Sequence, residues 1–426
     1  MAVRLADLLA GLSRLADLGF GLQAGEALRS CALATRLARS LDLPEDDVRA
    51  AFYTALLHHV GCTGYAHETA RIFGDELALN VAAGRANPAD PRDVFATFLP
   101  TLLRGRPPLE QARMALVTFT RGNRFGEAYT TAACEVARDA ARRLRLPEAV
   151  QRSVYHVYED WRGGGAPSGL AGDDLPAGSR LARLTGIAVL FDTVGGVELA
   201  VDAVRRRGGA MLDPWMAGRF AEHAEALLGE IGASDPRALV LEAEPPPVVS
   251  VPDQELAGVA AVFADLADLK SPATHGHSSG VAALARGAGE RLRLPPGTVS
   301  DLEVAGLLHD VGRVAVSDVV WEKPGPLSAH EWEQVRLHAY HSERILAGSE
   351  RLAALASLVG MHHERLDGSG YHRGCRDTDL AMPARVLAAA DAYQAMTQRR
   401  PHRPALATEV AERRLLDDAG RRALDA

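Results

Sequence analysis

The sequence has few aromatic side chains, few cysteines and no concentrated positive charge. Aromatic residues make up 5% of the 426 residues, and β-branched runs are short, which disfavours an all-β fold. The four cysteines form no CxxC pair, a pattern typical of a reduced cytoplasm. The net charge is −8, and the longest basic run covers only residues 205–207, so direct binding to nucleic acid is not expected.

Long apolar stretches are also missing. No charge-free stretch approaches the ~18 residues that cross a bilayer, and the best candidate, residues 184–191, is far too short. The first twenty residues alternate charged and apolar side chains at helical spacing, as an amphipathic helix does and a signal peptide does not. The sequence therefore predicts a cytoplasmic protein without a membrane segment.

Helix-forming residues are abundant instead. Alanine, leucine and arginine lose little free energy on entering a helix, and their abundance predicts an all-α fold. A chain of 426 residues exceeds one core of ordinary size, so we expect two or three domains. The excess of arginine over lysine is typical of a GC-rich bacterial source.

The chain contains an internal repeat. Residues 56–61 read LLHHVG and residues 307–312 read LLHDVG, 251 positions apart. A second block, residues 157–169, resembles residues 362–374 at a separation of 205. The two separations differ by 46, so the first copy carries about that many extra residues between the blocks. A repeat of this length indicates duplicated domains rather than a solenoid.

A proline-rich, helix-breaking segment lies between the two copies. It reads EAEPPPVVSVPD, a composition suited to a stiff linker. We predict two tandem helical bundles: an N-terminal domain over residues 1–241, a linker over 242–253 and a C-terminal domain over 254–426.

Residues that can bind metal are concentrated in the second copy, which holds nine of the fifteen histidines between positions 275 and 372. Imidazoles and carboxylates together suit divalent metals such as Fe, Mn, Zn or Co. The candidates at or near successive helix ends are His277, His309, Asp310, His338, His362, His363 and Asp391. Seven ligands exceed the needs of one tetrahedral metal and suffice for two metals about 3.5–4 Å apart. The histidines at 275, 330, 341 and 402 are expected to be ordinary structural residues.

The segments LLHDVG, KPGPLSAHEWEQVRLHAYHSERIL, HHERLDGSGY and ARVLAAADAYQAM resemble the HD-GYP family of metal-dependent phosphohydrolases, over roughly residues 265–408. The resemblance implies an HD-type helical bundle with a bi- or trinuclear metal centre. It implies two divalent metals, with Fe or Mn favoured and Zn, Co or Ni as alternatives. Many family members hydrolyse cyclic di-GMP, so the implied substrate is a cyclic dinucleotide or a related nucleotide.

The same resemblance assigns roles at the site. The seven candidates above take the ligand positions, and Asp310 becomes the carboxylate that bridges the metals. A metal-activated hydroxide would attack phosphorus in line while the metals neutralise the phosphoryl oxygens. Arg313 occupies a position where the family usually has a phosphate-contacting lysine, and it keeps the charge while adding a bidentate fork. We therefore expect Asp310 and Arg313 to take part in catalysis.

Four more residues have an expected role with a plainer alternative. Tyr371 and His372 stand in the family's Gly-Tyr-Pro signature, where His372 replaces the proline. His372 is expected either to touch substrate or to be a solvated loop residue, and the same choice applies to Lys323. Glu364 is expected either to orient a ligand histidine or to form an ion pair with Arg365.

The first copy has different residues at the ligand positions. His277 becomes Glu26, Asp310 becomes His59, His362 and His363 become Val157 and Tyr158, and Asp391 becomes Gly186. This copy is expected to be degenerate, with a role in packing, dimerisation or ligand sensing, and a homodimer is one expected assembly. A single ion held by Glu26, His58, His59 and His67 is the alternative.

The sequence thus predicts a metal-dependent phosphodiesterase of cyclic di-GMP or a related cyclic dinucleotide. Two alternatives stay open at this point. One is a signalling module that binds a nucleotide without turnover, and the other is an HD phosphatase acting on a nucleotide phosphomonoester.

Overall fold

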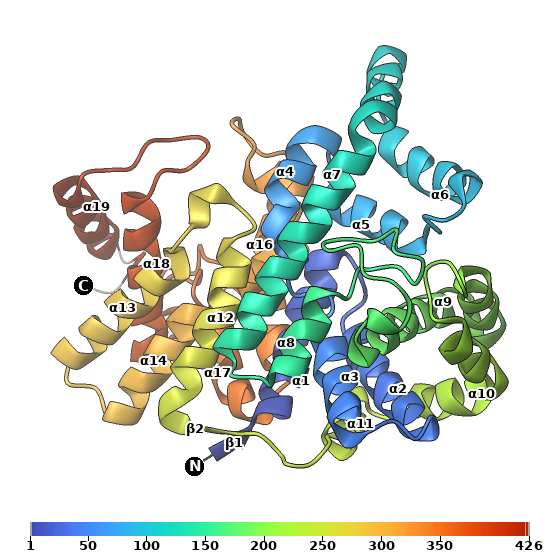
Figure 1. Ribbon diagram of the computed structural model, residues 1–426. Helices are drawn as coiled ribbons and strands as arrows, with labels where there is room; N and C mark the ends of the chain where they lie inside the picture. The colour runs from blue at the N-terminus through green and yellow to red at the C-terminus, as the bar shows by residue number, and fades with distance from the viewer. Residues whose placement is uncertain (1, 422, 425–426) are drawn as a thin grey trace. The chain divides into compact units, whose positions relative to one another are not determined.

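The computed structural model describes residues 2–421 and 423–424, and these residues are almost entirely helical (Figure 1). Two short strands, β1 (Ala2–Arg4) and β2 (Ser250–Pro252), pair antiparallel with Val3 opposite Val251. The prediction of an all-α fold is confirmed. The chain divides into two compact units, residues 5–249 and residues 250–426 together with 1–4, called here the first and the second unit. The division falls inside the predicted linker.

The first unit, all of whose residues are described, contains eleven α-helices. Its bundle is formed by α1 (Leu5–Phe20), α2 (Glu26–Ser40), α3 (Glu45–Leu56), α8 (Glu148–Tyr155), α9 (Ala177–Arg207), α10 (Pro214–Gly232) and α11 (Pro236–Ala243). The segment between α3 and α8 contributes α4 (Ala66–Phe73), α5 (Glu76–Arg85), α6 (Pro91–Leu103) and α7 (Pro108–Arg143). The additional residues predicted for the first copy lie in this second group.

The second unit has a similar bundle. It is built from α12 (Leu256–Asp268), α13 (His277–Arg291), α14 (Pro296–Leu308), α15 (Asp318–Trp321), α16 (Ala329–Leu346), α17 (Glu350–Gly360), α18 (Met382–Thr397) and α19 (Thr408–Gly420). A 3-10 turn, Val311–Ala315, follows α14. Local sequence explains the helix starts: Pro296 occupies the first turn of α14, and Ser328 and Glu331 form a capping box at α16.

The two units have the same arrangement at the start of one helix: a glycine precedes it and a buried aspartate accepts hydrogen bonds from its first residues. Gly25 before α2 and Gly276 before α13 both have positive φ, 105° and 69°, a region that favours glycine. Asp17 accepts the backbone N–H groups of Gly25 and Ala27. Asp268, 251 positions later, accepts the N–H and hydroxyl of Ser278. In each copy, a buried aspartate at the equivalent position therefore accepts hydrogen bonds from the beginning of the equivalent helix.

Helix α9 is long and apolar enough to cross a membrane, judged by length and composition alone. The helix is interrupted at Gly195 and Gly196, and Gly196 has φ 81°. Its side chains Leu181, Leu184 and Ala188 are fully buried, so α9 supplies part of the core of the first unit.

Candidate metal centre

All seven predicted ligands meet in the second unit. His277 is the first residue of α13, and His309 and Asp310 directly follow the last residue of α14. His338 lies within α16, His362 and His363 come after the end of α17, and Asp391 lies within α18. Six of the side chains are buried and that of His363 is partly exposed. Three helix ends and two helix interiors, from five helices in all, thus place one polar cluster inside an apolar bundle.

Asp310 lies at the centre of this cluster. Its Oδ2 atom is 3.6 Å from Nε2 of His277 and 3.5 Å from Nε2 of His309. Its Oδ1 atom is 3.3 Å from Nε2 of His338 and 3.7 Å from Nε2 of His362. The two oxygens of one carboxylate therefore face two different pairs of imidazoles.

Asp391 is the second carboxylate of the cluster. Its Oδ1 atom is 3.1 Å from Nε2 of His277 and 3.7 Å from Nε2 of His309, and its Oδ2 atom is 3.6 Å from Nδ1 of His363. The donor atoms form two groups: Asp310 with His338, His362 and His363, and Asp391 with His277 and His309. Each group, with the shared Asp310, has enough donors for one divalent ion.

The orientation of the imidazoles suits metal binding. Nδ1 of His309 donates to the carbonyl of Gly306 at 2.8 Å, and Nδ1 of His362 donates to that of Val359 at 2.6 Å. His338 makes the same contact with the carbonyl of Val335. A proton fixed at Nδ1 leaves the lone pair of Nε2 directed at the cluster, the arrangement that second partners give to metal-binding histidines.

The charge states also suit a cation. Burial by itself would raise the pKa of Asp310, but His309 and Arg313 hold it well below its usual range. Burial acts on Asp391 in the same way, and His277 and His309 outweigh it, so its pKa is also well below the usual range. Burial lowers the pKa of His363, helped by His362. Burial acts to lower the pKa of His309 as well, but Asp310 and Asp391 outweigh it and raise this pKa to about 9. The cluster thus combines ionised carboxylates and the neutral imidazole of His363 with one imidazole, His309, whose proton a metal would displace.

Two buried side-chain atoms of the cluster, Nε2 of His309 and Oδ1 of Asp310, lack a hydrogen-bond partner of normal geometry within the described residues. Nε2 of His309 is fully buried and makes no hydrogen bond of normal geometry, although both carboxylates lie within 3.7 Å. A buried polar atom without a partner costs free energy, and coordination to a metal would remove that cost. The residues present therefore fit two divalent metals.

Comparison with known protein families now identifies this part of the chain. Residues 261–426 match the family described as "HD domain". These residues form an HD domain. The predicted relationship to HD-type phosphohydrolases is confirmed.

Named relatives of the chain are bacterial phosphodiesterases. A 3′3′-cGAMP-specific phosphodiesterase of Vibrio cholerae is 28% identical over 411 residues, which cover 96% of this chain and 89% of that enzyme. A cyclic di-GMP phosphodiesterase of Pseudomonas aeruginosa is 37% identical over 145 residues, 34% of this chain and 35% of that enzyme. The chain thus spans most of the first relative and about a third of the second.

A solved structure shares the fold along the whole chain. The crystal structure of a cyclic GMP-AMP-specific phosphodiesterase of V. cholerae aligns with 100% of this chain and 95% of its own, with a TM-score of 0.68 and 24% sequence identity. The predicted arrangement of tandem helical bundles is therefore confirmed at the level of the fold.

Arg313 lies at the edge of the ligand cluster of the HD domain. Its guanidinium carbon is 3.7 Å from the ring centroid of Trp321, and its Nη1 is 3.4 Å from Oδ2 of Asp310. The indole N–H of Trp321 donates to the carbonyl of Arg313 at 3.2 Å. Trp321 therefore fixes both the backbone and the side chain of Arg313, a role that no sequence motif indicated.

The other predicted substrate contacts are divided between two locations. The ring of Tyr371 lies 4.7 Å from that of His363, so Tyr371 borders the cluster. Lys323 instead forms an ion pair with Glu331 at 2.7 Å. Nε2 of His372 is 3.7 Å from Oε2 of Glu343 on α16. A substrate contact stays a prediction for all three, and only Tyr371 lies beside a ligand.

The structure gives Glu364 a contact that differs from both alternatives expected for it. The buried carboxylate accepts the backbone N–H groups of Arg373, Gly374 and Cys375 at 2.7, 3.2 and 2.9 Å. Glu159, 205 positions earlier, accepts those of Ser168 and Gly169 at 2.6 and 3.1 Å. Glu364 thus holds the loop that follows Tyr371 and His372, and Arg365 lies 3.9 Å from Asp418 instead. The sequence pattern missed this role because the acceptor and its donors belong to one irregular loop.

The sequence analysis also did not identify Gln398 and Arg400, two residues that lie near His277. Oε1 of Gln398 lies 3.0 Å from Nδ1 of His277, and Nη2 of Arg400 lies 3.4 Å from the same nitrogen. Burial and the neighbouring Arg313 lower the pKa of Arg400 to about 10. Arg400 is therefore a second partly buried guanidinium beside the cluster, after Arg313. In the sequence, only the RRPHRP stretch after Asp391 pointed to Arg400. Because the chain is rich in arginine, that stretch did not distinguish Arg400 from other arginines.

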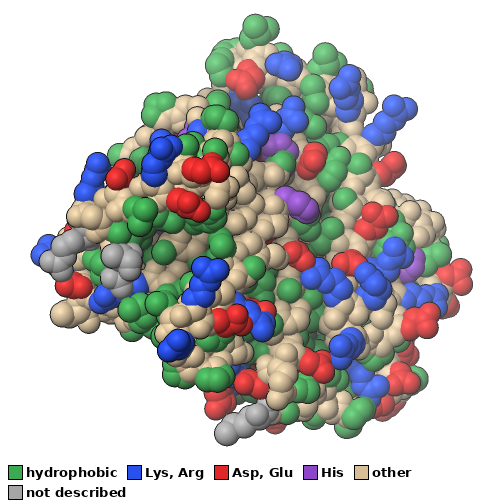
Figure 2. All heavy atoms as spheres, turned by 90° about the vertical axis from the view of Figure 1, so that its left-hand side faces the viewer, with side chains coloured by type: hydrophobic (Ala, Val, Ile, Leu, Met, Phe, Trp, Pro, Cys, Tyr) green, Lys and Arg blue, Asp and Glu red, His purple; other side chains and the backbone are tan. Residues whose placement is uncertain are grey.

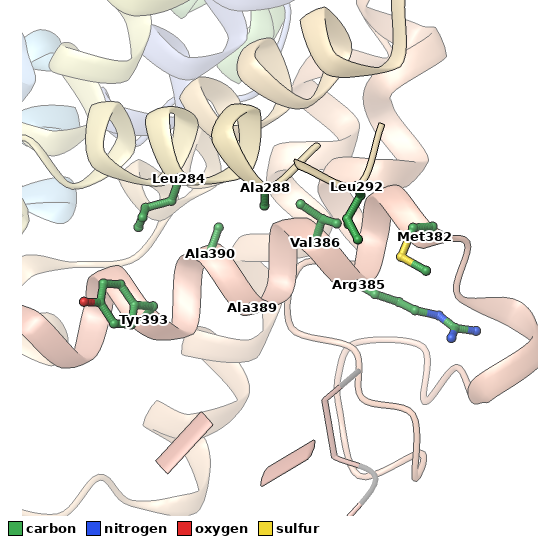
Figure 3. A pocket seen from close by; sticks show the side chains of 9 residues that line it. All are labelled: Leu284, Ala288, Leu292, Met382, Arg385, Val386, Ala389, Ala390 and Tyr393. Atoms are coloured by element: carbon green, nitrogen blue, oxygen red, sulfur yellow. The ribbon is translucent and has the colours of Figure 1, made fainter. Parts of the chain in front are cut away.

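A groove between α13 and α18 lies on the same two helices but outside the cluster. Leu284 of α13 and Leu292, directly after its end, face Met382, Val386 and Tyr393 of α18 across it (Figure 3). None of the seven ligands lines this groove. Figure 2 shows acidic and basic side chains interspersed with hydrophobic ones on one face of the molecule.

In the first unit, polar and aromatic side chains are packed where the ligands would be. His59 stacks between Phe20 and His58, with ring centroids 4.1 and 4.2 Å away, and its Nδ1 is 3.1 Å from the hydroxyl of Tyr158. Arg183 lies 4.9 Å above the ring of Tyr158. Burial lowers the pKa of His59 to about 3 and that of His58 well below its usual range.

A glycine completes this packing. A Cβ atom at Gly186 would lie 3.0 Å from the ring of His58, so the position equivalent to Asp391 is sterically filled. Residues 5–249, all of them described, contain no group of three candidate ligands drawn from this unit alone. The alternative of one ion held by Glu26, His58, His59 and His67 therefore has no support in the geometry.

Proposed function

We propose that the HD domain hydrolyses a phosphodiester bond of a cyclic dinucleotide, with two divalent metals bound by the seven-residue cluster. The observation that carries this proposal is the position of Asp310, whose two oxygens face two separate pairs of imidazoles at 3.3–3.7 Å. A carboxylate so placed can bridge two ions, the arrangement that phosphodiester hydrolysis uses to stabilise both the attacking and the leaving oxygen.

Metals bound there would supply Lewis acidity towards the phosphoryl oxygens and lower the pKa of a water molecule. His277, His309 and Asp391 would hold one ion and His338, His362 and His363 the other, with Asp310 shared. Mixed imidazole and carboxylate donors suit Fe and Mn, and they also accept Zn, Co or Ni.

The chain supplies positive charge of its own for a phosphate. Arg313 is held against Trp321 beside Asp310, and Arg400 lies near His277. Guanidinium groups bind phosphate with two parallel N–H donors. We infer that Arg313 and Arg400 draw the phosphodiester towards the cluster from one side, while Tyr371 borders it beside His363.

The names of the relatives support a cyclic dinucleotide as the substrate. The relative aligned over nearly the whole chain is specific for 3′3′-cGAMP, and other relatives act on cyclic di-GMP. We propose that the substrate is one of these two molecules. A reduced bacterial cytoplasm agrees with this proposal, since all four cysteines are free and three are buried.

The decisive experiment is turnover of a panel of cyclic dinucleotides by anaerobically purified protein with Fe, with Mn or without metal. We expect hydrolysis of 3′3′-cGAMP or cyclic di-GMP only in the metal-loaded protein. Absence of hydrolysis with two equivalents of metal bound would reject the phosphodiesterase and favour a module that binds nucleotides without turnover. Release of phosphate from a nucleotide monoester alone would favour a phosphatase.

A further inference from the structure

The segment that distinguishes the first unit from the second contains a helical hairpin formed by α6 and the N-terminal part of α7 (Figure 1). One face of α7 is used inside the unit. Met114 is buried in a cluster with Phe73 and Leu102, and Val117 and Phe125 pack against it. These positions recur at helical spacing, so the opposite face of α7 points away from this cluster.

That opposite face has apolar side chains in contact with solvent. Leu109, Leu116 and Phe119 are exposed to 85%, 63% and 84%. With the exposed residues Ala112, Asn123 and Gly126 they form the α7 stripe: Leu109, Ala112, Leu116, Phe119, Asn123 and Gly126. Its spacing alternates between three and four residues, which is the pattern of helices that pair along a seam.

The edges of the α7 stripe suit close pairing with an identical helix. No stripe residue is charged, and Ala115 and Gly122 on one flank are small. In a parallel, in-register pair, this flank faces Thr120 and Glu127 of the other copy, so no like charges meet. Asn123 occupies a seam position where a polar residue specifies a parallel pair in register.

The exposed area is of the size that a dimer requires. Complete burial of Leu109, Leu116 and Phe119 in two copies would remove roughly 900 Å² of mostly apolar surface, close to the ~1,000 Å² of a small specific interface. On one copy the three side chains expose about 450 Å² of surface, the size of the largest apolar patch on many proteins, which is often functional. We propose that the α7 stripe is the homodimer interface, with two α7 helices paired in parallel.

The test uses sedimentation of the full-length chain over a range of concentrations. We expect a dimer in the micromolar range, and Phe119→Glu should raise the dissociation constant on the order of 100-fold or more, since it truncates a central apolar contact in both copies. The matched control is Leu416→Glu, because Leu416 is 70% exposed on α19 and lies outside the α7 stripe. The control should leave the dissociation constant unchanged.

Orientation is tested by oxidation. Leu116→Cys places two thiols opposite each other in a parallel pair, within disulfide reach, and should give a covalent dimer where the wild type gives none. A monomeric wild type, a dimer that persists in Phe119→Glu, or a dimer without the Leu116→Cys crosslink would overturn the proposal. A stripe protected in a monomer would indicate instead that another part of the chain covers it.

Discussion

The guanidinium carbon of Arg313 lies over the ring of Trp321, 3.7 Å from its centroid, while Nη1 of Arg313 is 3.4 Å from Oδ2 of Asp310. The side chain that replaces the family's lysine is therefore held in place by an aromatic ring. A cation over an indole face gains about 0.5–2 kcal/mol, which restricts a flexible side chain before substrate binds.

Removing the ring should loosen Arg313 and weaken catalysis. We expect Trp321→Leu to lower kcat/KM about 3- to 30-fold, the size of the lost cation–π contact, with bound metal unchanged. Steady-state kinetics with metal analysis measures both. Trp332→Leu is the matched control, since Trp332 is half-exposed on α16 and should have little effect. Equal losses in the two variants would contradict a positioning role for Trp321.

Replacing Asp310 should affect both metals at once. Asp310→Asn removes the charge that faces both pairs of imidazoles, so we expect bound metal to fall from about two equivalents per chain to one or fewer. Turnover should fall by about 100-fold or more. Elemental analysis of the purified protein gives the metal content. Asp367→Asn, in an exposed loop, should keep two equivalents, and full loading of Asp310→Asn would refute the bridging role.

Glu364 and Glu159 offer a paired test of loop anchoring. Glu364→Gln turns acceptors of three N–H groups into an amide that cannot accept all of them. We expect a loss of about 1–3 kcal/mol in the free energy of unfolding and faster hydrogen exchange at residues 373–375. Glu159→Gln should instead accelerate exchange at residues 168–169. Unchanged exchange at 373–375 in Glu364→Gln would show that the loop is held by other contacts.

Metal removal should destabilise one unit only. All seven candidate metal-binding side chains belong to the second unit. A metal ion present at 100 times its dissociation constant would therefore stabilise that unit alone, by about 2.7 kcal/mol. Chelation should therefore speed hydrogen exchange in α13, α14 and α18 and leave α2 and α3 unchanged. Equal acceleration in α2 and α3 would place a metal in the first unit.

The clustering of the seven candidate ligands could be predicted from sequence because its signal is local. His309 and Asp310 end an apolar helix, and His362 and His363 follow another, so the residue types and the helix period together indicated one inward-facing cluster. The all-α fold followed from composition and from helical spacing in the same way. The repeat of 251 positions was equally readable.

Residues that act through long-range or irregular contacts could not be found in this way. Trp321 reaches Arg313 from a four-residue helix, and Arg400 reaches His277 from a loop after α18. Each is one residue among many of its type, and only the folded chain shows its partner. The stripe on α7 was hidden for another reason, since the sequence does not show which face of a long helix the rest of the unit covers.

The contact between Gly186 and His58 makes the loss of the first site difficult to reverse. Restoring a carboxylate at position 186 alone would press it against an imidazole 3.0 Å from its Cβ, and His58 is itself stacked on His59. A carboxylate at this position therefore requires the His58 ring to shift by a few tenths of an ångström. Its return depends on a second adjustment, in the stack of His58 and His59.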